Sequence, residues 1–591
     1  MCGIVAVFGK ENAPSVVVEG LKKLEYRGYD SWGVGTFGEQ SITLEKQVGK
    51  ISEAVLPKNF PNTRIAIGHT RWATHGGVTP ENAHPHSDEN FRIAVVHNGI
   101  IENFVQLRSN LRKRGHHFAS DTDTEVIAHL IEEGLDAGHS LRRAAQQAAQ
   151  QCEGRFAFVC IAFGTQEMVA IRQGSPLILG LGNKNDYYLA SDTPAFCEYT
   201  SKVHYIDDGE LVHIDASGAQ VFSLSSLEKR EKRTITLDNK TENIEKGDHA
   251  HFMIKEIFEQ KETIAHAIDQ DEEEIQTIAK AIRGARGTFL IGCGTAHKVA
   301  VAGEYFFSQI AKRHINTVVA SEFPIFHDFL RPESLVIAIS QSGETADVIE
   351  AIEAARQAES KVLSIVNKKN STIARMSDFS LCINAGPEQA VASTKAATSQ
   401  LSLLLLLAYA CAGKLHEGKK MLIELAAQVN DMLNPRFVEF VAGIAKKIVH
   451  HENIFIIGKG ANFPMAREAA IKIQEVSYIH AEGFAGGELK HGPIAMIERG
   501  TPCIALVSDD ELQQKEIISN AMEIKARGGY IIGIAPENSE VFDEWIRVPH
   551  GGRASALLNL IPVQILSYYL AIERGFDPDK PRNLAKSVTV K

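Results

Sequence analysis

The sequence predicts a multidomain α/β protein in which a domain of mostly antiparallel sheets precedes two copies of a parallel α/β domain. Its 591 residues are too many for one hydrophobic core. The first third consists largely of short apolar runs of strand type, with helical patterns only around 16–24 and 124–133. Past residue 250, strand and helix patterns alternate and repeat at an offset of about 166 to 169 positions, which indicates a duplicated parallel unit.

The composition is that of an ordinary globular protein, with 44% hydrophobic and 23% charged residues. A net charge of −11 without a long basic run disfavours nucleic acid and anionic membranes as partners. The apolar run at 401–411 is shorter than the roughly 20 residues of a membrane span, and we expect a buried helix there. The eight cysteines form no C-x-x-C pair, so we expect neither a disulfide framework nor a zinc site in a cytoplasmic protein.

The chain's second residue, Cys2, is a candidate nucleophile. The run CGIVAVFG at 2–9 predicts a buried strand, which would hold this end of the chain in place. If Met1 is removed, Cys2 carries both a thiol and a free α-amine. A thiol with a pKa of roughly 8.5 is mostly protonated at neutral pH, and the amine is a base within reach of its proton.

Polar motifs follow the strands of the first domain. They are GHTRWATHGG at 68–77, HNGI at 97–100 and DTDTE at 121–125. Taken singly, each has an ordinary explanation as a turn, a helix cap or a surface ion pair. The histidines there lack the helical spacing of a metal site, and we expect no metal at His69, His75, His84, His86 and His97.

Together with CGI at 2–4 and NAHPH at 82–86, these motifs resemble the glutaminase domain of N-terminal-nucleophile amidotransferases. The resemblance implies a four-layer αββα fold that hydrolyses glutamine to glutamate and ammonia. It implies that Cys2 attacks the amide carbon while Asn98 and Gly99 hold the oxyanion. Arg71 would bind the α-carboxylate of glutamine and Asp123 its α-ammonium. The remaining glutamine-binding residues implied by the resemblance are Arg27, Trp72, Thr74 and His75.

The duplicated half differs between its copies at one loop. The first copy has SQSGET at 340–345 and the second has SDDE at 508–511. Hydroxyl and N–H groups at a helix N-terminus favour phosphate, whereas acids repel it, so we expect the first copy alone to bind a phosphorylated ligand. A dinucleotide site at the Gly-x-Gly of 292–294 is disfavoured, because the third glycine and the acid about 20 residues on are missing.

These features resemble a pair of sugar isomerase (SIS) domains with parallel sheets flanked by helices. Further matching stretches are KGD at 246–248, VASTK at 391–395, residues 475–482, GELKHGP at 487–493 and the tail at 581–590. With the glutaminase domain in front, nearly the whole chain resembles glutamine-dependent aminotransferases that act on sugar phosphates. The implied domains are a glutaminase domain at 1–235, a linker at 236–250, SIS domains at 251–430 and 431–575, and a catalytic tail at 576–591.

The resemblance implies that fructose 6-phosphate and glutamine become glucosamine 6-phosphate and glutamate, the first step of amino-sugar synthesis. Ammonia would pass from Cys2 to the sugar site, with no cofactor, in a homodimer. His491 would open the sugar ring, Lys586 would form an imine at C2, and Glu475 with Lys472 would move a proton from C1 to C2. The implied sugar-phosphate residues are Thr295, Ser340, Gln341, Ser342, Thr345, Val391 and Ala585.

Two positions depart from the family pattern, and two other functions remain open. Ala296 stands where a serine is usual, which removes a hydroxyl near the sugar, and Gln474 replaces a commonly basic residue. One alternative keeps the glutaminase but uses another ketose phosphate as acceptor. The other is a regulator whose SIS half only senses a sugar phosphate, which the combination of Glu475, His491 and Lys586 argues against.

Overall fold

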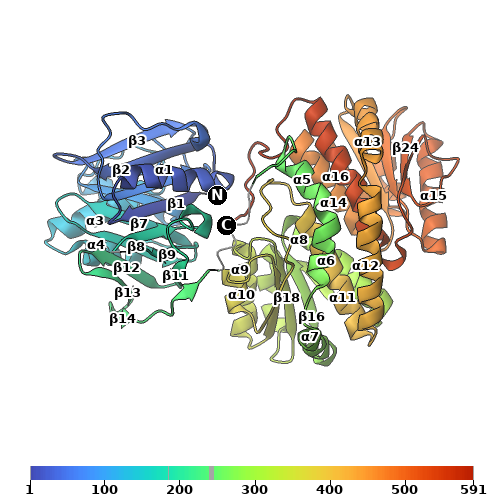
Figure 1. Ribbon diagram of the computed structural model, residues 1–591, viewed down its shortest axis with the longest axis horizontal. Coiled ribbons are helices and arrows are strands. Elements are labelled where there is room, and N and C mark those ends of the chain that lie inside the picture. The colour runs from blue at the N-terminus through green and yellow to red at the C-terminus, as the bar shows by residue number, and fades with distance from the viewer. Residues whose placement is uncertain (1, 184, 238–244, 590–591) are drawn as a thin grey trace. The chain divides into compact units, whose positions relative to one another are not determined.

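The computed structural model describes residues 2–183, 185–237 and 245–589 and divides into two compact units (Figure 1). One unit comprises Met1–Thr241 with Ala585–Lys591, and the other comprises Glu242–Leu584. Part of the expected linker, 238–244, lies outside the described residues. Strand β15 (Ile235–Thr236) pairs with β11 (Lys202–Tyr205), so the first unit continues past residue 235.

The first unit contains two antiparallel sheets. The eight-stranded sheet has the order β15, β11, β9 (Ile178–Leu181), β10 (Tyr187–Ala190), β1 (Gly3–Phe8), β4 (Ile65–Arg71), β2 (Ser31–Phe37) and β3 (Ile42–Val48). The seven-stranded sheet has the order β14 (Lys229–Arg230), β13 (Gly218–Ser223), β12 (Glu210–Asp215), β8 (Met168–Gln173), β7 (Phe156–Ala162), β6 (Ile93–Gly99) and β5 (His86–Ser87). The expected strand at the start of the chain is β1, and it is fully buried.

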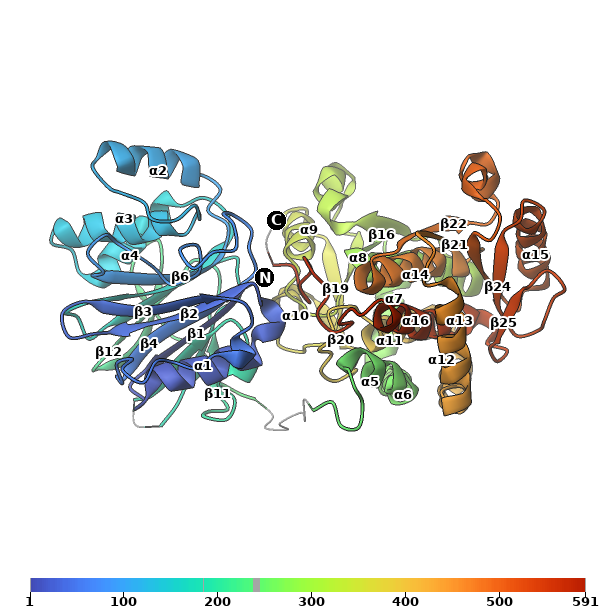
Figure 2. The same cartoon turned by 90° about the horizontal axis from the view of Figure 1, so that it is seen from above.

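Helices cover the outer faces of both sheets, which gives the expected αββα layers (Figure 2). One apolar cluster fills the space between the sheets, and a second lies between α1 (Ala13–Lys23) and the eight-stranded sheet. A third lies between the seven-stranded sheet and the helices α2 (Phe104–Lys113), α3 (Glu125–Asp136) and α4 (Leu141–Gln151). The sequence analysis predicted α1 and α3 but missed α2 and α4, which have a low mean hydropathy although their few apolar residues are spaced as in an amphipathic helix.

The second unit contains two parallel five-stranded sheets with the same strand order. The first sheet runs β17 (Asn316–Val319), β16 (Thr288–Gly292), β18 (Leu335–Ser340), β19 (Lys361–Val366), β20 (Phe379–Cys382). The second runs β22 (His480–Ala485), β21 (Asn453–Gly458), β23 (Pro502–Leu506), β24 (Tyr530–Ala535), β25 (Glu544–Arg547). This shared order confirms the duplication that the sequence predicted.

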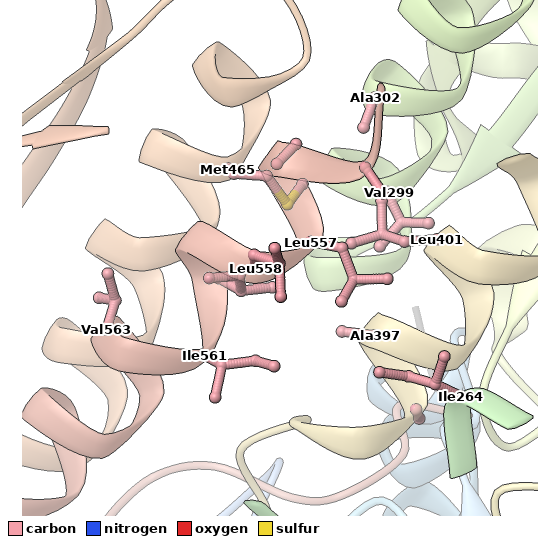
Figure 3. Close-up of a cluster of buried hydrophobic side chains, with 14 of the residues drawn as sticks. Ile264, Val299, Ala302, Ala397, Leu401, Met465, Leu557, Leu558, Ile561 and Val563 are labelled. Atoms are coloured by element: carbon pink, nitrogen blue, oxygen red, sulfur yellow. The ribbon is translucent and has the colours of Figure 1, made fainter. Parts of the chain in front are cut away.

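Helices pack between and outside these two sheets. The inner ones form one continuous apolar core with both sheets, part of which is drawn in Figure 3. Helices α9 and α15 cover the outer faces. The helices of this unit are α5 (Phe252–Phe258), α6 (Gln260–Ile268), α7 (Glu272–Gly284), α8 (Gly294–Phe306), α9 (Ala346–Gln357), α10 (Thr372–Met376), α11 (Lys395–Cys411), α12 (Leu415–Met432), α13 (Pro435–Ile448), α14 (Asn462–Ser477), α15 (Glu511–Lys525) and α16 (Ser555–Glu573).

Three segments of this unit can be compared with what their composition indicates. The run at 401–411 forms the buried end of α11, as expected. The amphipathic pattern at 252–267 predicts one helix, whereas the structure forms two, α5 and α6. The segment Gly552–Glu573 is long and apolar enough to cross a membrane, but 89% of it is buried within the protein. Its composition is therefore that of a core helix, surrounded on all sides by apolar neighbours.

The first strand of each copy ends in a glycine where the following helix approaches closely. A Cβ on Gly292 would lie 2.9 Å from the backbone of Ala296, and one on Gly458 would lie 2.3 Å from the backbone oxygen of Asn462. A side chain at either position would push the helix away from the sheet. The matching glycines are therefore a packing requirement of the repeated strand–helix unit.

We predict that Gly458→Ala lowers the free energy of unfolding by about 1–3 kcal/mol, because the added methyl overlaps backbone atoms. Thermal unfolding should show this as a lower midpoint. The matched control is Gly443→Ala within α13, where a Cβ meets nothing within 4 Å. Alanine there should stabilise the helix by about 0.5–1 kcal/mol. Equal shifts in the two variants would contradict the proposed close approach.

Candidate functional sites

Cys2 lies at the start of β1, an interior strand of the eight-stranded sheet. Strand β1 is paired with β4 on one side and β10 on the other. The thiol of Cys2 accepts a hydrogen bond from the N–H of Trp72, with 3.3 Å between Sγ and N. Burial raises the pKa of the thiol, and the bond from Trp72 and the charge of Arg71 offset part of this effect. The sulfur is held in place but needs a base to ionise it.

The expected oxyanion residue Asn98 lies beside Cys2 at the end of β6. Its side-chain nitrogen donates to the carbonyl oxygen of Cys2 at 3.0 Å. Its side-chain oxygen lies 3.0 Å from Nε2 of His69, which also lies 2.9 Å from the carbonyl oxygen of His97. Burial lowers the pKa of His69 to about 3, so the ring is neutral and its single N–H can orient the Asn98 amide. Sequence reasoning missed this positioning role of His69.

Arg71 ends strand β4, and Asp123 lies on the loop before α3 of the same unit. The guanidinium of Arg71 is buried and donates to the carbonyl oxygens of residues 75–77, with 3.0 Å to that of Gly77. Asp123 precedes α3 and accepts from the N–H of Ile101 at 2.8 Å. Both charges act on the Cys2 thiol, Arg71 lowering and Asp123 raising its pKa. A zwitterionic ligand beside Cys2 would therefore find one group of each sign.

The other expected glutamine residues are placed differently. Arg27 is buried and forms an ion pair with Asp192 at 2.9 Å, which holds its guanidinium within the unit. Thr74 is exposed, and the half-buried ring of His75 contacts Phe104 edge-on. Trp72 is half-buried and contacts Cys2 through its backbone. Trp72 and Asn98 thus contact Cys2 directly, and the charge of Arg71 acts on its thiol.

Three buried histidines of the first unit, His69, His84 and His86, form a contacting group of neutral rings. The rings of His69 and His84 lie 4.0 Å apart, and His84 lies 4.7 Å from His86. Burial lowers the pKa of both His84 and His86 well below the usual value. His84 and His97 contact the hydroxyl of Thr124, which begins α3. These contacts therefore tie the loop that carries Asp123 to the sheets.

In the second unit, the expected sugar-phosphate residues follow two neighbouring strands. Both sheets have the doubly wound order in which the first and third strands are adjacent, and ligands bind at the carboxyl ends of those strands. In the first sheet these strands are β16, followed by Thr295, and β18, followed by Ser340–Thr345. The loop that the sequence indicated therefore lies where this fold class binds ligands.

Hydroxyl groups gather on the loop between β18 and α9. The hydroxyls of Ser340 and Thr345 lie 2.9 Å apart, and Ser340 accepts from the N–H of Gly343 at 3.1 Å. Ser342 accepts from the N–H of Glu344 at 3.2 Å, and Gln341 is half-buried. The N-terminus of α9 directly follows Thr345. Hydroxyl donors and a helix N-terminus at one loop suit a phosphate group.

The equivalent loop of the second copy is closed by its own acids. Asp509 accepts from the N–H groups of Gly551 and Gly552 at 2.8 and 2.6 Å, and lies 2.7 Å from His550. Asp510 caps α15 by accepting from the N–H of Gln513. A carboxylate of the protein thus occupies donors that an anionic ligand would need.

A buried charged cluster links α8 and α14. The ammonium of Lys472, with a side chain only 1% exposed, lies 2.6 Å from Glu475 and 3.5 Å from Glu468. Glu468 accepts from the hydroxyl of Thr295 at 2.9 Å. Burial would lower the pKa of Lys472, but the two carboxylates outweigh it and raise the pKa; burial raises the pKa of Glu468. Sequence reasoning missed Glu468, although it lies one turn from Lys472 on α14.

The remaining expected residues lie on loops. Val391 is half-buried, and its N–H donates to the carbonyl oxygen of Asp579 at 3.1 Å. His491 is exposed and ends a short 3₁₀ turn, Glu488–His491. Ala585 and Lys586 are half-buried and belong to the first compact unit.

Family models match most of the chain. The model of the SIS domain matches residues 281–410 and 447–574. The model of the glutamine amidotransferase domain matches residues 57–229. These matches agree with the two parallel sheets and with the antiparallel layers, respectively.

Curated relatives match the chain over its whole length. The glutamine–fructose-6-phosphate aminotransferases (isomerizing) of Thermococcus kodakarensis and Pyrococcus horikoshii are each 41% identical, with 100% of both chains covered. Among solved structures, the C-terminal domain of the glucosamine-fructose-6-phosphate aminotransferase of Francisella tularensis is 30% identical, with a TM-score of 0.53. It covers 57% of this chain and 100% of its own. The chain belongs to the family of isomerizing glutamine–fructose-6-phosphate aminotransferases.

Proposed function

We propose that the chain converts fructose 6-phosphate and glutamine into glucosamine 6-phosphate and glutamate. The observation that carries this proposal is the 41% identity over the full length of relatives that bear this name. Both sets of expected catalytic residues are present in the same chain. We further propose the domain limits given above, a homodimer and a cytoplasmic location.

The glutaminase half-reaction is assigned to Cys2. Its sulfur attacks the side-chain amide of glutamine, and its own α-amine, freed by removal of Met1, accepts the thiol proton. Asn98 and the N–H of Gly99 stabilise the oxyanion, and the amine returns the proton to the leaving ammonia. Water then hydrolyses the thioester to glutamate. Arg71 lowers and Asp123 raises the pKa of the Cys2 thiol, so a positive and a negative group both act on this position. This supports the assignment of Arg71 to the carboxylate and Asp123 to the ammonium of glutamine.

The sugar half-reaction is assigned to the second unit and the tail. The hydroxyls at Ser340–Thr345 hold the phosphate, and His491 opens the furanose ring. Lys586 forms an imine with the C2 ketone and loses water, after which ammonia displaces the lysine amine. Glu475, whose carboxylate is fixed by Lys472, moves the proton from C1 to C2, which yields the 2-amino aldose. The hydrogen bond between Thr295 and Glu468 supports a place for Thr295 beside this carboxylate pair.

We predict that Cys2→Ala lowers glutamine hydrolysis by more than about a thousandfold, since the nucleophile is lost. Conversion of fructose 6-phosphate to glucose 6-phosphate should persist, because other residues carry it. Both rates are measured on the same preparation. Cys197→Ala, at another half-buried cysteine of the first unit, is the control and should retain both. Hydrolysis at the original rate in Cys2→Ala would exclude Cys2 as the nucleophile.

We predict that Lys472→Met destabilises the protein by about 3–5 kcal/mol, because it leaves Glu468 buried without its cation. The measurement is chemical unfolding followed by fluorescence and circular dichroism. Lys515→Met is the control, since Lys515 pairs with Glu511 on the exposed face of α15 and should leave the midpoint unchanged. Similar midpoints for the two variants would contradict a structural role for the buried cluster.

We predict that Lys586→Arg abolishes imine formation, because a guanidinium remains protonated and offers no free amine. Borohydride reduction in the presence of fructose 6-phosphate should attach the sugar to the tail peptide of the unmodified chain, which mass spectrometry detects. Lys580→Arg, at another lysine of the tail, should still be labelled. If Lys586→Arg were labelled to the same extent, the imine would have to form on another lysine.

A further inference from the structure

Two histidines and a glutamate converge in the first unit at a place that the proposed reaction does not use. His129 and Glu132 lie three residues apart on α3 and therefore share one face of the helix. His116 follows α2 and reaches the same point. We call His116, His129 and Glu132 the histidine–glutamate triad. The sequence predicted no zinc site, because it has no C-x-x-C pair and because His116, which completes the triad, lies outside the helix that carries His129 and Glu132.

The three ligand atoms of the triad form an almost equilateral triangle. Nδ1 of His116 lies 3.1 Å from Nδ1 of His129 and 3.1 Å from Oε2 of Glu132, and the latter two atoms are also 3.1 Å apart. Ligands at about 2.0–2.1 Å from a tetrahedral zinc ion are separated by roughly 3.3 Å. The triangle therefore has nearly the size of one face of such a coordination sphere.

Protons alone do not satisfy this triangle. If only one Nδ1 carries a hydrogen, the other Nδ1 and the carboxylate present lone pairs to each other at 3.1 Å. If both Nδ1 atoms carry hydrogens, the two N–H donors lie 3.1 Å apart, and neither can accept a hydrogen bond from the other. A cation bound by all three lone pairs removes both conflicts.

His116 and Glu132 each have a second hydrogen-bonding partner of the kind that orients metal ligands, and a carboxylate lies near the far nitrogen of His129. Nε2 of His116 lies 3.2 Å from Glu133, and Nε2 of His129 lies 3.8 Å from Glu125. The other oxygen of Glu132 accepts from Arg92 at 3.0 Å. A carboxylate behind a histidine fixes the tautomer in which the opposite nitrogen is free to bind metal. Here His116 would be fixed with Nδ1 toward the centre of the triad, whereas Nε2 of His129 is beyond hydrogen-bond distance of Glu125. Burial lowers the pKa of His129, but Glu125 and Glu132 outweigh it and raise the pKa to about 9, so a metal ion bound there would replace a proton on this ring.

The surrounding charges favour a cation. The ion pairs around the triad bring together two guanidinium groups, of Arg92 and Arg114, with a larger number of carboxylates. The carboxylates are Asp88, Glu125, Glu132, Glu133 and Asp136. The side chain of His129 is 0% exposed and that of His116 is 14% exposed. The triad is thus mostly desolvated but has one side from which an ion and a water ligand can enter.

We propose that the histidine–glutamate triad binds one divalent transition-metal ion of the zinc class, with water as the fourth ligand. Two imidazoles and one carboxylate form a donor set that suits Zn²⁺ better than Mg²⁺ or Ca²⁺, which prefer oxygen. The ion would join α3 to the segment after α2. It would also support Glu125, which accepts from the N–H groups of Ala119 and Ser120 in the loop before α3. The site is therefore structural, and it is independent of the proposed reaction.

The test uses the full chain, treated with chelator, dialysed and titrated with Zn²⁺. We expect one tightly bound Zn²⁺ per chain by elemental analysis and a higher midpoint of thermal unfolding with Zn²⁺ than without it. Co²⁺ should give the visible absorption of a tetrahedral site with nitrogen and oxygen ligands. Mg²⁺ at the same concentration should change neither signal. A chain that retains no Zn²⁺ after titration and gel filtration would overturn the proposal.

Variants locate the ion. His116→Gln removes a partly exposed ligand and should abolish tight binding while the protein keeps its circular dichroism spectrum. Glu133→Gln removes only the partner behind His116 and should weaken binding by about 10- to 100-fold. His117→Gln, at the adjacent exposed histidine, is the control and should bind Zn²⁺ as the unmodified chain does. Unchanged Zn²⁺ affinity and Co²⁺ absorption in His116→Gln would show that any bound metal lies elsewhere and would refute the site.

Discussion

The position of β1 inside its sheet is the constraint on which the glutaminase site depends. An N-terminal residue ordinarily moves freely, but Cys2 directly precedes a fully buried strand paired on both edges. The backbone of Trp72, at the end of the neighbouring strand β4, reaches the thiol, and Asn98 reaches the carbonyl of Cys2. The sheet thus fixes the candidate nucleophile from the strand that follows it and from the two neighbouring segments that contact it.

The second unit contains two copies of one strand–helix packing arrangement that differ in the loop after the third strand. Both copies have the same strand order and the same close approach of helix to glycine. Their loops after the third strand differ, since one presents hydroxyls and in the other Asp509 accepts from the N–H groups of Gly551 and Gly552, in a segment after β25. The buried pair of Lys472 and Glu468 then connects α14 of the second copy to Thr295 in α8 of the first. The two copies therefore share their strand–helix packing, while the loops after their third strands differ in the groups that they present.

Much of this architecture could be predicted from local pattern, and the rest could not for a physical reason. Continuous apolar runs identified β1 and the parallel strands, and the hydroxyl-rich loop at Ser340 identified the phosphate candidate. The roles of His69, Glu468 and the histidine–glutamate triad depend on side chains that meet across long stretches of sequence. Spacing along one helix does not reveal a partner such as His116, which approaches from another segment. Helices α2 and α4 were missed because most of their residues are polar, although the few apolar ones have helical spacing.

The interior place of β1 also sets an order of events during synthesis. The strand leaves the ribosome first, yet its partner β10 follows roughly 180 residues later, a separation that makes the pairing slow and non-local. At roughly 5–20 residues per second, about ten to forty seconds pass before β10 has been made. During that interval β1 lacks one of its two partner strands. Removal of Met1, which the proposed mechanism requires, cleaves the Met1–Cys2 peptide bond and would compete with closure of the sheet, so that translation speed sets the time available for it.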